Sequence, residues 1–170
     1  MKTKKETYLG KTVLIATGKQ PKKLNVPGEN ELYGKGVTFC ATCDAPLFAG
    51  KEVSVIGGGN SAMDAALLLE KYCKKISILT INPEMRGDAV MLQKIKKSKK
   101  IKIIPNAKTT KIFGNKFVAG LRHLQNGKEK TLKIQGVFVE IGLTPSSQMI
   151  NFVKKNQWGE ILVDKKNMTS

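Results

Sequence analysis

The segment KEVSVIGGGNSAMDAALLLEKY constrains the fold more than any other part of the sequence. Val53 to Ile56 is a short apolar run, three glycines follow it, and apolar residues then recur at helical spacing from Ala62 to Tyr72. A strand, a tight turn and a helix in this order are the first part of a parallel βαβ unit. The segment therefore predicts an α/β fold.

The alternation of strands and helices continues along the rest of the chain. Asp88 is the expected N-cap of a second helix, and Gly-Asn and Asn-Gly pairs mark the turns of an antiparallel ribbon over residues 109–133. Further strands are expected at residues 11–18, 75–82, 100–106 and 136–142. Together these elements predict a Rossmann-like three-layer domain with a parallel sheet plus an antiparallel β-ribbon.

The glycine turn fits the pattern G-x-G-x-x-A. In that pattern the first glycine makes the tight turn, and the second lets the backbone approach a pyrophosphate. The N-terminus of the helix that follows offers free N–H groups and a partial positive charge to phosphates. The alternative is a tight turn that binds nothing. We expect the dinucleotide-binding residues to be Gly57, Gly58, Gly59, Asn60, Ser61 and Ala62.

The residues after the next strand leave the choice between NADH and NADPH open. An acidic residue about 20 positions beyond the turn would bind the ribose hydroxyls of NAD. This sequence has Thr80, Ile81 and Asn82 there, with neither a carboxylate nor a cluster of arginines. Arg86 is the nearby side chain that could contact a 2′-phosphate. The expected cofactor is therefore NAD(P)H.

Cys40 and Cys43 are separated by two residues in VTFCATCDAPLF, and Asp44 follows them directly. This spacing allows a reversible disulfide, and the neighbouring carboxyl group could exchange a proton with a departing thiolate. Zinc and an inert buried pair are the alternatives. Because Cys73 and His123 do not stand at ligand spacing, we expect no metal and favour a redox dithiol.

Composition argues against two classes of partner. The 30 Lys and Arg residues exceed the 13 Asp and Glu residues, but only Arg86 and Arg122 are arginines and the lysines are spread along the chain. This distribution favours a solvated surface over a nucleic-acid interface, although it would suit anionic ligands. No apolar run approaches the ~20 residues that cross a bilayer. We therefore expect a cytoplasmic protein with no nucleic-acid and no membrane partner. We expect Cys73 and His123 to be structural, and Trp158 to serve in packing or in a domain contact.

Five motifs together resemble the low-molecular-weight thioredoxin reductases and their relatives, the flavoprotein components of alkyl hydroperoxide reductase. They are IATG, VPGENELYGKGVTFCATCDAPLF, VSVIGGGNSAMDAALLL, EMRGDAVMLQ and GVFVEIGLTPSS. The resemblance covers nearly the whole chain, and the fixed distance from the cysteine block to the glycine turn makes it specific.

The resemblance implies an electron route from NAD(P)H through FAD to the Cys40–Cys43 disulfide and on to a disulfide in a partner protein such as thioredoxin. It implies that Cys43 faces the flavin, Cys40 attacks the partner and Asp44 supplies a proton. It further implies a homodimer for full-length members. The residues implied to lie near the flavin are Ala16, Thr17 and Gly18, and those near the pyridine nucleotide are Ile141 and Gly142.

The sequence departs from the family pattern in two ways. Thioredoxin reductases have a His-Arg-Arg triplet where this chain has Thr80 to Asn82, and the peroxide-reductase relatives have a glutamate at Thr80. No flavin-domain strand with its own glycine motif precedes Lys11. We therefore expect an incomplete FAD site and protein that purifies without FAD. The expected organisation is a flavin-domain stub and connector (1–34), an NAD(P)H-binding domain with the C-x-x-C pair (35–143), and a return segment (144–170).

Two functional hypotheses follow from different classes. In the first, the chain is the NAD(P)H-binding and dithiol part of a flavin-dependent disulfide reductase, incomplete as an enzyme by itself. In the second, it is a stand-alone module that binds a dinucleotide or a partner without turnover. Reversible oxidation of the cysteine pair favours the first.

Overall fold

The computed structural model describes residues 3–166 and 168–169 of the chain. The chain divides into two compact units. Residues 21–143 form the first, called here the α/β unit, and the residues up to 20 together with those from 144 onward form the second, called here the terminal unit. The predicted segment 1–34 therefore contributes to both units.

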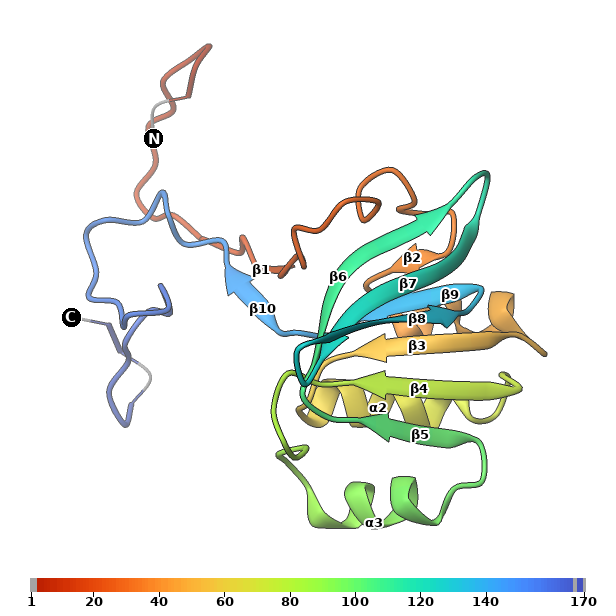
Figure 1. Ribbon diagram of the computed structural model, residues 1–170. Coiled ribbons are helices and arrows are strands. Elements are labelled where there is room, and N and C mark those ends of the chain that lie inside the picture. Colours follow the sequence, from red (N-terminus) through yellow and green to blue (C-terminus); the bar gives the residue numbers. More distant parts are fainter. Residues whose placement is uncertain (1–2, 167, 170) are drawn as a thin grey trace. The chain divides into compact units, whose positions relative to one another are not determined.

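A parallel sheet of five strands forms the centre of the α/β unit (Figure 1). The strand order is β2-β9-β3-β4-β5, and all neighbours are parallel. Its strands are β2 (Val37–Thr38), β9 (Gly136–Val139), β3 (Glu52–Ile56), β4 (Lys75–Leu79) and β5 (Ile101–Ile104). Nearly every position of β3, β4 and β9 is buried, as expected for strands that are covered on both faces.

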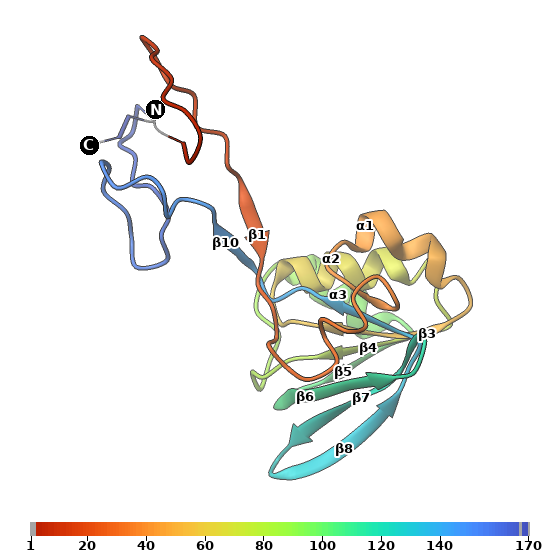
Figure 2. The same ribbon diagram turned by 90° about the horizontal axis from the view of Figure 1, so that it is seen from above.

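Helices cover one face of this sheet, and a second sheet covers the other (Figure 2). The helices are α1 (Ala41–Asp44), the 3-10 turn η1 (Ala45–Phe48), α2 (Asn60–Leu69) and α3 (Ala89–Lys97). The second sheet is antiparallel and consists of β6 (Ala107–Gly114), β7 (Val118–Gln125) and β8 (Lys128–Lys133). The prediction of a Rossmann-like three-layer fold with an antiparallel ribbon is therefore confirmed.

Helices α2 and α3 form where the sequence repeats apolar residues on one side, and α3 also has a side-chain cap at its start. In α2, Ala62, Ala65, Ala66 and Leu69 repeat at helical spacing, and all of them are buried against the sheet. In α3, the predicted N-cap Asp88 accepts a hydrogen bond of 2.9 Å from the Met91 N–H. The last turn of α3 is rich in lysine, which suits the negative end of the helix dipole.

The core on the helical side includes Phe138 from β9, which is fully buried. Its ring meets that of Phe48 edge to face, with 4.9 Å between ring centres. Full burial of one such side chain stabilises the fold by roughly 1.5–3 kcal/mol. Because Phe48 follows the cysteine pair in sequence, this contact anchors the end of the cysteine segment to the sheet.

The antiparallel sheet has the two predicted turns. Asn126 and Gly127, between β7 and β8, both have positive φ, of 51° and 76°. Asn-Gly is the pair that most readily adopts this turn in a two-residue hairpin. The predicted final strand is shorter than expected, because β9 ends at Val139 and Gly142 has a φ of +100° that interrupts the extended backbone.

The prediction of a buried strand over residues 11–18 is wrong. These residues are exposed and outside any strand, with Val13 63% and Leu14 92% accessible. A strand needs a neighbour to accept its N–H groups, and no such neighbour occurs among the residues that the structure describes. Strand β1 (Lys19–Pro21) begins after this segment and pairs with β10 (Leu143–Pro145).

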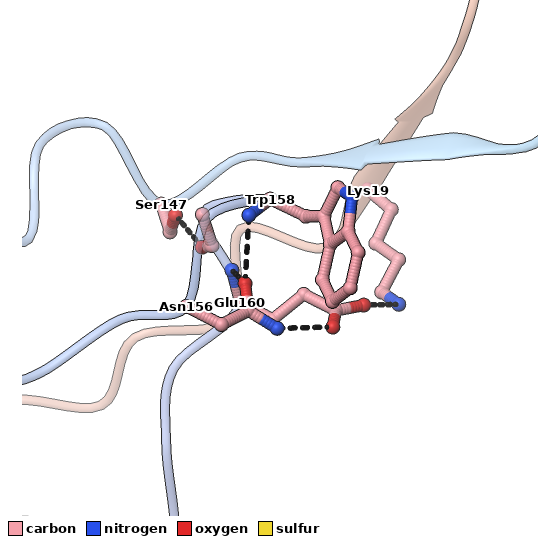
Figure 3. Close-up of polar contacts among 6 residues, drawn as sticks. Lys19, Ser147, Asn156, Trp158 and Glu160 are labelled. Carbon is pink, nitrogen blue, oxygen red and sulfur yellow. Dashed lines mark hydrogen bonds and ion pairs between the residues drawn. The ribbon is translucent and has the colours of Figure 1, made fainter.

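A compact turn over residues 156–160 belongs to the terminal unit (Figure 3). The Asn156 Oδ1 atom accepts hydrogen bonds of 2.9 Å from the N–H groups of Trp158 and Glu160. The Glu160 carboxylate lies 3.4 Å from the Lys19 ammonium group, and the Ser147 hydroxyl donates to the Gly159 carbonyl at 2.5 Å. Side-chain hydrogen bonds therefore hold this turn, which has no helix beside it in the described part of the unit.

Within residues 3–166 and 168–169, no helix is both long and apolar enough to span a bilayer.

Candidate functional site

The glycine turn lies at the carboxyl ends of the parallel strands, where α/β sheets bind their ligands. It lines a pocket of about 590 Å³, called here the glycine-turn pocket, whose walls also come from the ends of β3, β4 and β9. Gly57 has a φ of +151°, and a Cβ atom there would be 2.2 Å from the Glu140 carbonyl oxygen. Only glycine fits at this position, which explains the first glycine of the motif.

The start of α2 leaves backbone donors free for an anion. Its N-cap is Gly59, which has no side chain to satisfy the first N–H groups. Asn60 and Ser61 line the glycine-turn pocket, whereas Ala62 is fully buried beneath it. Of the six residues of the predicted glycine motif, the five from Gly57 to Ser61 line the pocket. The sixth, Ala62, is buried and lets α2 pack closely against the sheet.

The charged residues that line the glycine-turn pocket are mostly basic. Thr80 is buried at the end of β4, and its Oγ1 atom would be 2.4 Å from a Cβ at Gly58. Arg86 lines the pocket together with Lys23 and Lys108, which come from separate parts of the chain. Three basic residues against one carboxylate suit a negatively charged group more than uncharged ribose hydroxyls.

Cys40 and Cys43 form a disulfide, with 5.3 Å between their Cα atoms. Cys40 is the N-cap of α1, so the pair lies across the first turn of that helix, with Cys43 exposed. The Thr38 hydroxyl accepts a hydrogen bond of 3.2 Å from the Cys40 N–H and donates one to the Asp44 carboxylate. The predicted catalytic residues Cys40, Cys43 and Asp44 are therefore brought together, with Thr38 linking the first to the last.

A second pocket, of about 550 Å³ and called here the disulfide pocket, adjoins this pair. Cys40 and Ala41 form part of its wall, and Asp64 and Leu68 of α2 form another part. Ser61 and Glu140 line both this pocket and the glycine-turn pocket. The disulfide and the expected nucleotide site therefore share a wall.

Glu140 is the carboxylate in that wall. Burial raises the pKa of its carboxyl group above the usual value, and a hydrogen bond from the Ala41 backbone N–H opposes the shift. Ala41 directly follows Cys40, so this hydrogen bond reaches the peptide group between the disulfide and α1. The next two residues, Ile141 and Gly142, line the glycine-turn pocket; the family resemblance implies that they lie near the pyridine nucleotide.

The predicted flavin-contacting residues Ala16, Thr17 and Gly18 lie in the other unit. They line a pocket of about 580 Å³ formed by the terminal unit itself. The Thr17 hydroxyl donates a hydrogen bond of 2.7 Å to the Ser146 carbonyl, within that unit.

Three residues interpreted as structural have surroundings of different kinds. Cys73 is buried, its thiol donates to the Phe48 carbonyl at 3.4 Å, and burial raises its pKa to about 11. His123 is buried in β7, and burial, followed by the charge of Lys130, lowers its pKa. Trp158, expected to serve in packing or in a domain contact, is 63% exposed. No cluster of His, Cys, Asp or Glu suited to a metal occurs in the described part of the chain.

Sequence reasoning missed four residues of the site: Lys23, Thr38, Lys108 and Glu140. A signal existed for Glu140, since it is the first residue after a parallel strand and such positions face the ligand. The two lysines have no local signal, because the fold brings them to the pocket from distant segments.

Comparison with known proteins identifies the family of the chain. The family of pyridine nucleotide-disulphide oxidoreductases matches residues 1–170. Over 163 residues the chain is 42% identical to the F subunit of alkyl hydroperoxide reductase from Staphylococcus aureus (strain NCTC 8325 / PS 47) and 41% identical to a Bacillus subtilis (strain 168) protein named NADH dehydrogenase. Each match covers 94% of this chain and 32% of the relative, so the chain spans about a third of their length.

Solved structures give the same result. Thioredoxin reductase from T. acidophilum is 40% identical, with a TM-score of 0.88 over 99% of this chain and 57% of that one. Thioredoxin reductase from Lactococcus lactis is 28% identical, with a TM-score of 0.87 over 98% of this chain and 56% of that one. The resemblance noted in the sequence is confirmed. The chain belongs to the pyridine nucleotide-disulphide oxidoreductase family.

Proposed function

We propose that this chain supplies the NAD(P)H-binding and dithiol functions of a flavin-dependent, thioredoxin reductase-like disulfide oxidoreductase. The observation that carries the proposal is the shared wall between the glycine-turn pocket and the disulfide pocket. A nucleotide site alone would fit many dehydrogenases, and a cysteine pair alone would fit many thiol proteins. The two pockets adjoin in one compact unit. This adjacency favours a protein that transfers electrons between a bound nucleotide and the cysteine pair.

The residues present fit a dinucleotide. The uncapped N-terminus of α2 faces the pocket with free N–H groups, and Gly57 to Gly59 leave room for phosphates to approach the backbone. Arg86, Lys23 and Lys108 would balance the negative charge of the ligand. NADH or NADPH, when bound, would supply a hydride; the protein's part is to bind and orient the nucleotide.

The cysteine pair fits transfer of reducing equivalents to an external disulfide. In the reduced pair, the Cys40 thiolate would attack a partner disulfide and form a mixed disulfide, and the Cys43 sulfur would then displace the partner. The partner gains two electrons and the pair returns to its disulfide. The thiol groups of the partner need protons, and Asp44, held by the Thr38 hydroxyl, is placed to exchange one. The partner is a protein disulfide such as that of a thioredoxin-like protein.

The described residues do not form a complete flavin site. Flavins bind their pyrophosphate at a helix N-terminus after a glycine turn in Rossmann-like folds. The terminal unit, which holds Ala16 to Gly18, contains no helix among its described residues. We therefore propose only the nucleotide-binding and dithiol roles for this chain. A cytoplasmic setting, where thiols stay reduced, suits such a dithiol.

Two measurements on the purified chain test the proposal. Titration with NADH and with NADPH, followed by calorimetry, is expected to show binding of at least one. Thiol counting after reduction with dithiothreitol, before and after mild oxidation, is expected to show reversible loss of two reactive thiols. Cys40→Ser and Cys43→Ser each abolish that loss, while Cys73→Ser retains it, because the Cys73 thiol is buried and has a raised pKa.

Each measurement can contradict the proposal. A chain that binds neither nucleotide lacks the first function, whatever its thiols do. If the Cys40–Cys43 disulfide resists reduction, or does not form again on oxidation, the chain lacks the dithiol function. It is then a nucleotide-binding module without dithiol turnover.

A further inference from the structure

Glu140 contacts both functional regions of the α/β unit. Its backbone N–H donates to the Ile56 carbonyl at 2.8 Å, which fixes it at the carboxyl end of the sheet beside the glycine turn. The backbone N–H of Ala41, immediately after Cys40, lies near its carboxyl group and opposes the rise of its pKa. Glu140 therefore lines both pockets.

The charges around Glu140 differ between the two sides. In the glycine-turn pocket the other charged residues are Lys23, Arg86 and Lys108, all positive. In the disulfide pocket the other charged residue is Asp64 of α2, and Asp44 lies at the end of α1. Glu140 is therefore the one carboxylate in a basic nucleotide site and one of several acids near the cysteine pair, within the described residues that line these pockets.

We propose that Glu140 is a positioning residue that couples the two sites. It holds the disulfide turn through the Ala41 N–H, and its negative charge weakens dinucleotide binding in one pocket and ionisation of the reduced cysteine pair beside the other. The inference rests on the proposed function, because it assigns a dinucleotide to the glycine-turn pocket.

The sign of each effect follows from like-charge repulsion. A dinucleotide carries negative phosphates, so a carboxylate in the same pocket disfavours binding. A thiolate is also an anion, so the same carboxylate raises the pKa of a neighbouring thiol. Partial burial of Glu140 strengthens both effects relative to a surface carboxylate, since water screens the charge less there. Neutralising Glu140 should therefore tighten binding and promote thiolate formation together.

The test compares Glu140→Gln with wild type in the full chain. Glutamine keeps an oxygen that can accept the Ala41 N–H but removes the charge, so the fold and the disulfide turn should persist. Glu52→Gln is the matched control, because Glu52 is a partly buried carboxylate at the opposite, amino end of β3 and lines neither pocket. Glu140→Ala removes both the charge and the acceptor.

Three readouts separate the charge from the structural role. The first is the rate of iodoacetamide alkylation of the dithiothreitol-reduced chain against pH, which reports thiolate formation. The second is the affinity for NADH and NADPH at fixed pH. The third is amide hydrogen exchange at Ala41, which reports the hydrogen bond to Glu140.

We expect Glu140→Gln to move the alkylation midpoint to lower pH and to tighten nucleotide binding by about three- to tenfold. Glu52→Gln should change neither property. Exchange at Ala41 should be faster in Glu140→Ala than in Glu140→Gln. The inference is overturned if the wild type binds a nucleotide and Glu140→Gln leaves either the affinity or the alkylation midpoint unchanged, or if Ala41 exchanges at the same rate in all variants. If the wild type binds neither nucleotide, the proposed function fails first and the coupling fails with it.

Discussion

The backbone N–H of Arg86 donates a hydrogen bond of 2.8 Å to the carbonyl oxygen of Gly58. A second bond of 2.8 Å runs nearby from the Asp88 N–H to the Asn60 Oδ1 atom. The loop between β4 and α3 is thus joined to the glycine turn at two points. Arg86 therefore keeps its place beside the pocket through its backbone, while its exposed side chain stays available to a ligand.

Arg86→Ala should weaken binding of NADPH more than binding of NADH. The backbone bond to Gly58 does not need the side chain, so the pocket keeps its shape and loses only a guanidinium group. We expect about a tenfold loss of NADPH affinity if that group contacts the 2′-phosphate. Isothermal titration with both nucleotides measures the effect. Arg122→Ala is the matched control, because Arg122 is the only other arginine and pairs with Glu129 on the antiparallel sheet. Equal losses for both nucleotides would exclude selective contact with the phosphate.

Gly58→Ala and Gly59→Ala should separate stability from binding within one turn. A Cβ at Gly58 would lie 2.4 Å from Thr80 Oγ1, whereas a Cβ at Gly59 finds its nearest neighbour at 3.9 Å. We therefore expect Gly58→Ala to destabilise the fold by roughly 1–3 kcal/mol, and Gly59→Ala to cost about 0.5 kcal/mol.

Gly59→Ala should nevertheless weaken nucleotide binding, because its new methyl group projects where phosphates approach the start of α2. Urea unfolding and nucleotide titration on the same preparations check both expectations. A Gly59→Ala chain with wild-type affinity would place the phosphates elsewhere, and a Gly58→Ala chain of wild-type stability would contradict the packing of Thr80 on the turn.

His123, the only histidine in the chain, should make stability depend on pH. Burial and then Lys130 lower its pKa in the folded protein, so the unfolded state binds a proton more readily. Stability should therefore be highest above the unfolded pKa of about 6.5 and should fall as the pH drops below it.

His123→Leu should lose that component of the pH dependence. Its Nδ1 atom is buried with no hydrogen-bond partner in the described residues, so an apolar replacement of similar size should be tolerated near neutral pH. Urea midpoints measured from about pH 7.5 to about pH 5.5 give the comparison with wild type. Lys130→Gln removes the positive charge that is the second cause of the lowered His123 pKa. The loss of stability at low pH should therefore be smaller in this variant than in wild type. Identical pH profiles for wild type and His123→Leu would show that His123 titrates normally.

Asn156→Ala should loosen the turn of the terminal unit without affecting the α/β unit. The substitution removes the oxygen that accepts both the Trp158 and the Glu160 N–H groups. Amide exchange at those two positions should become faster by about fivefold, because each lost hydrogen bond is worth about 1 kcal/mol. Asn156→Asp keeps an acceptor and should retain most of the protection. Unchanged exchange in Asn156→Ala would mean that other contacts hold the turn.

The parts of the fold that were predicted correctly are those with local causes. The glycine turn, the N-cap at Asp88 and the Asn126-Gly127 hairpin each depend on residues within one or two turns of chain, so the pattern alone indicated them. The predicted strand at residues 11–18 had the right composition but no partner among the described residues, and composition cannot supply a neighbouring strand.

The site shows the same division. Sequence motifs identified the cysteine pair and the glycine turn as separate features, and the family resemblance related them. They did not indicate that one carboxylate, Glu140, would line both pockets, or that Lys23 and Lys108 would join Arg86.

Spacing and residue type are thus enough to establish an α/β chain with a dinucleotide-type turn and a disulfide-forming pair, because these depend on the conformations of short segments. The placement of charge around them was decided only in the folded chain. Parallel strands that are distant in sequence end at one edge of the sheet, and β6 and the segment before β2 bring their lysines to the same pocket. Electrostatic interactions act through space rather than along the chain, so the balance of charge at the site follows from the tertiary fold.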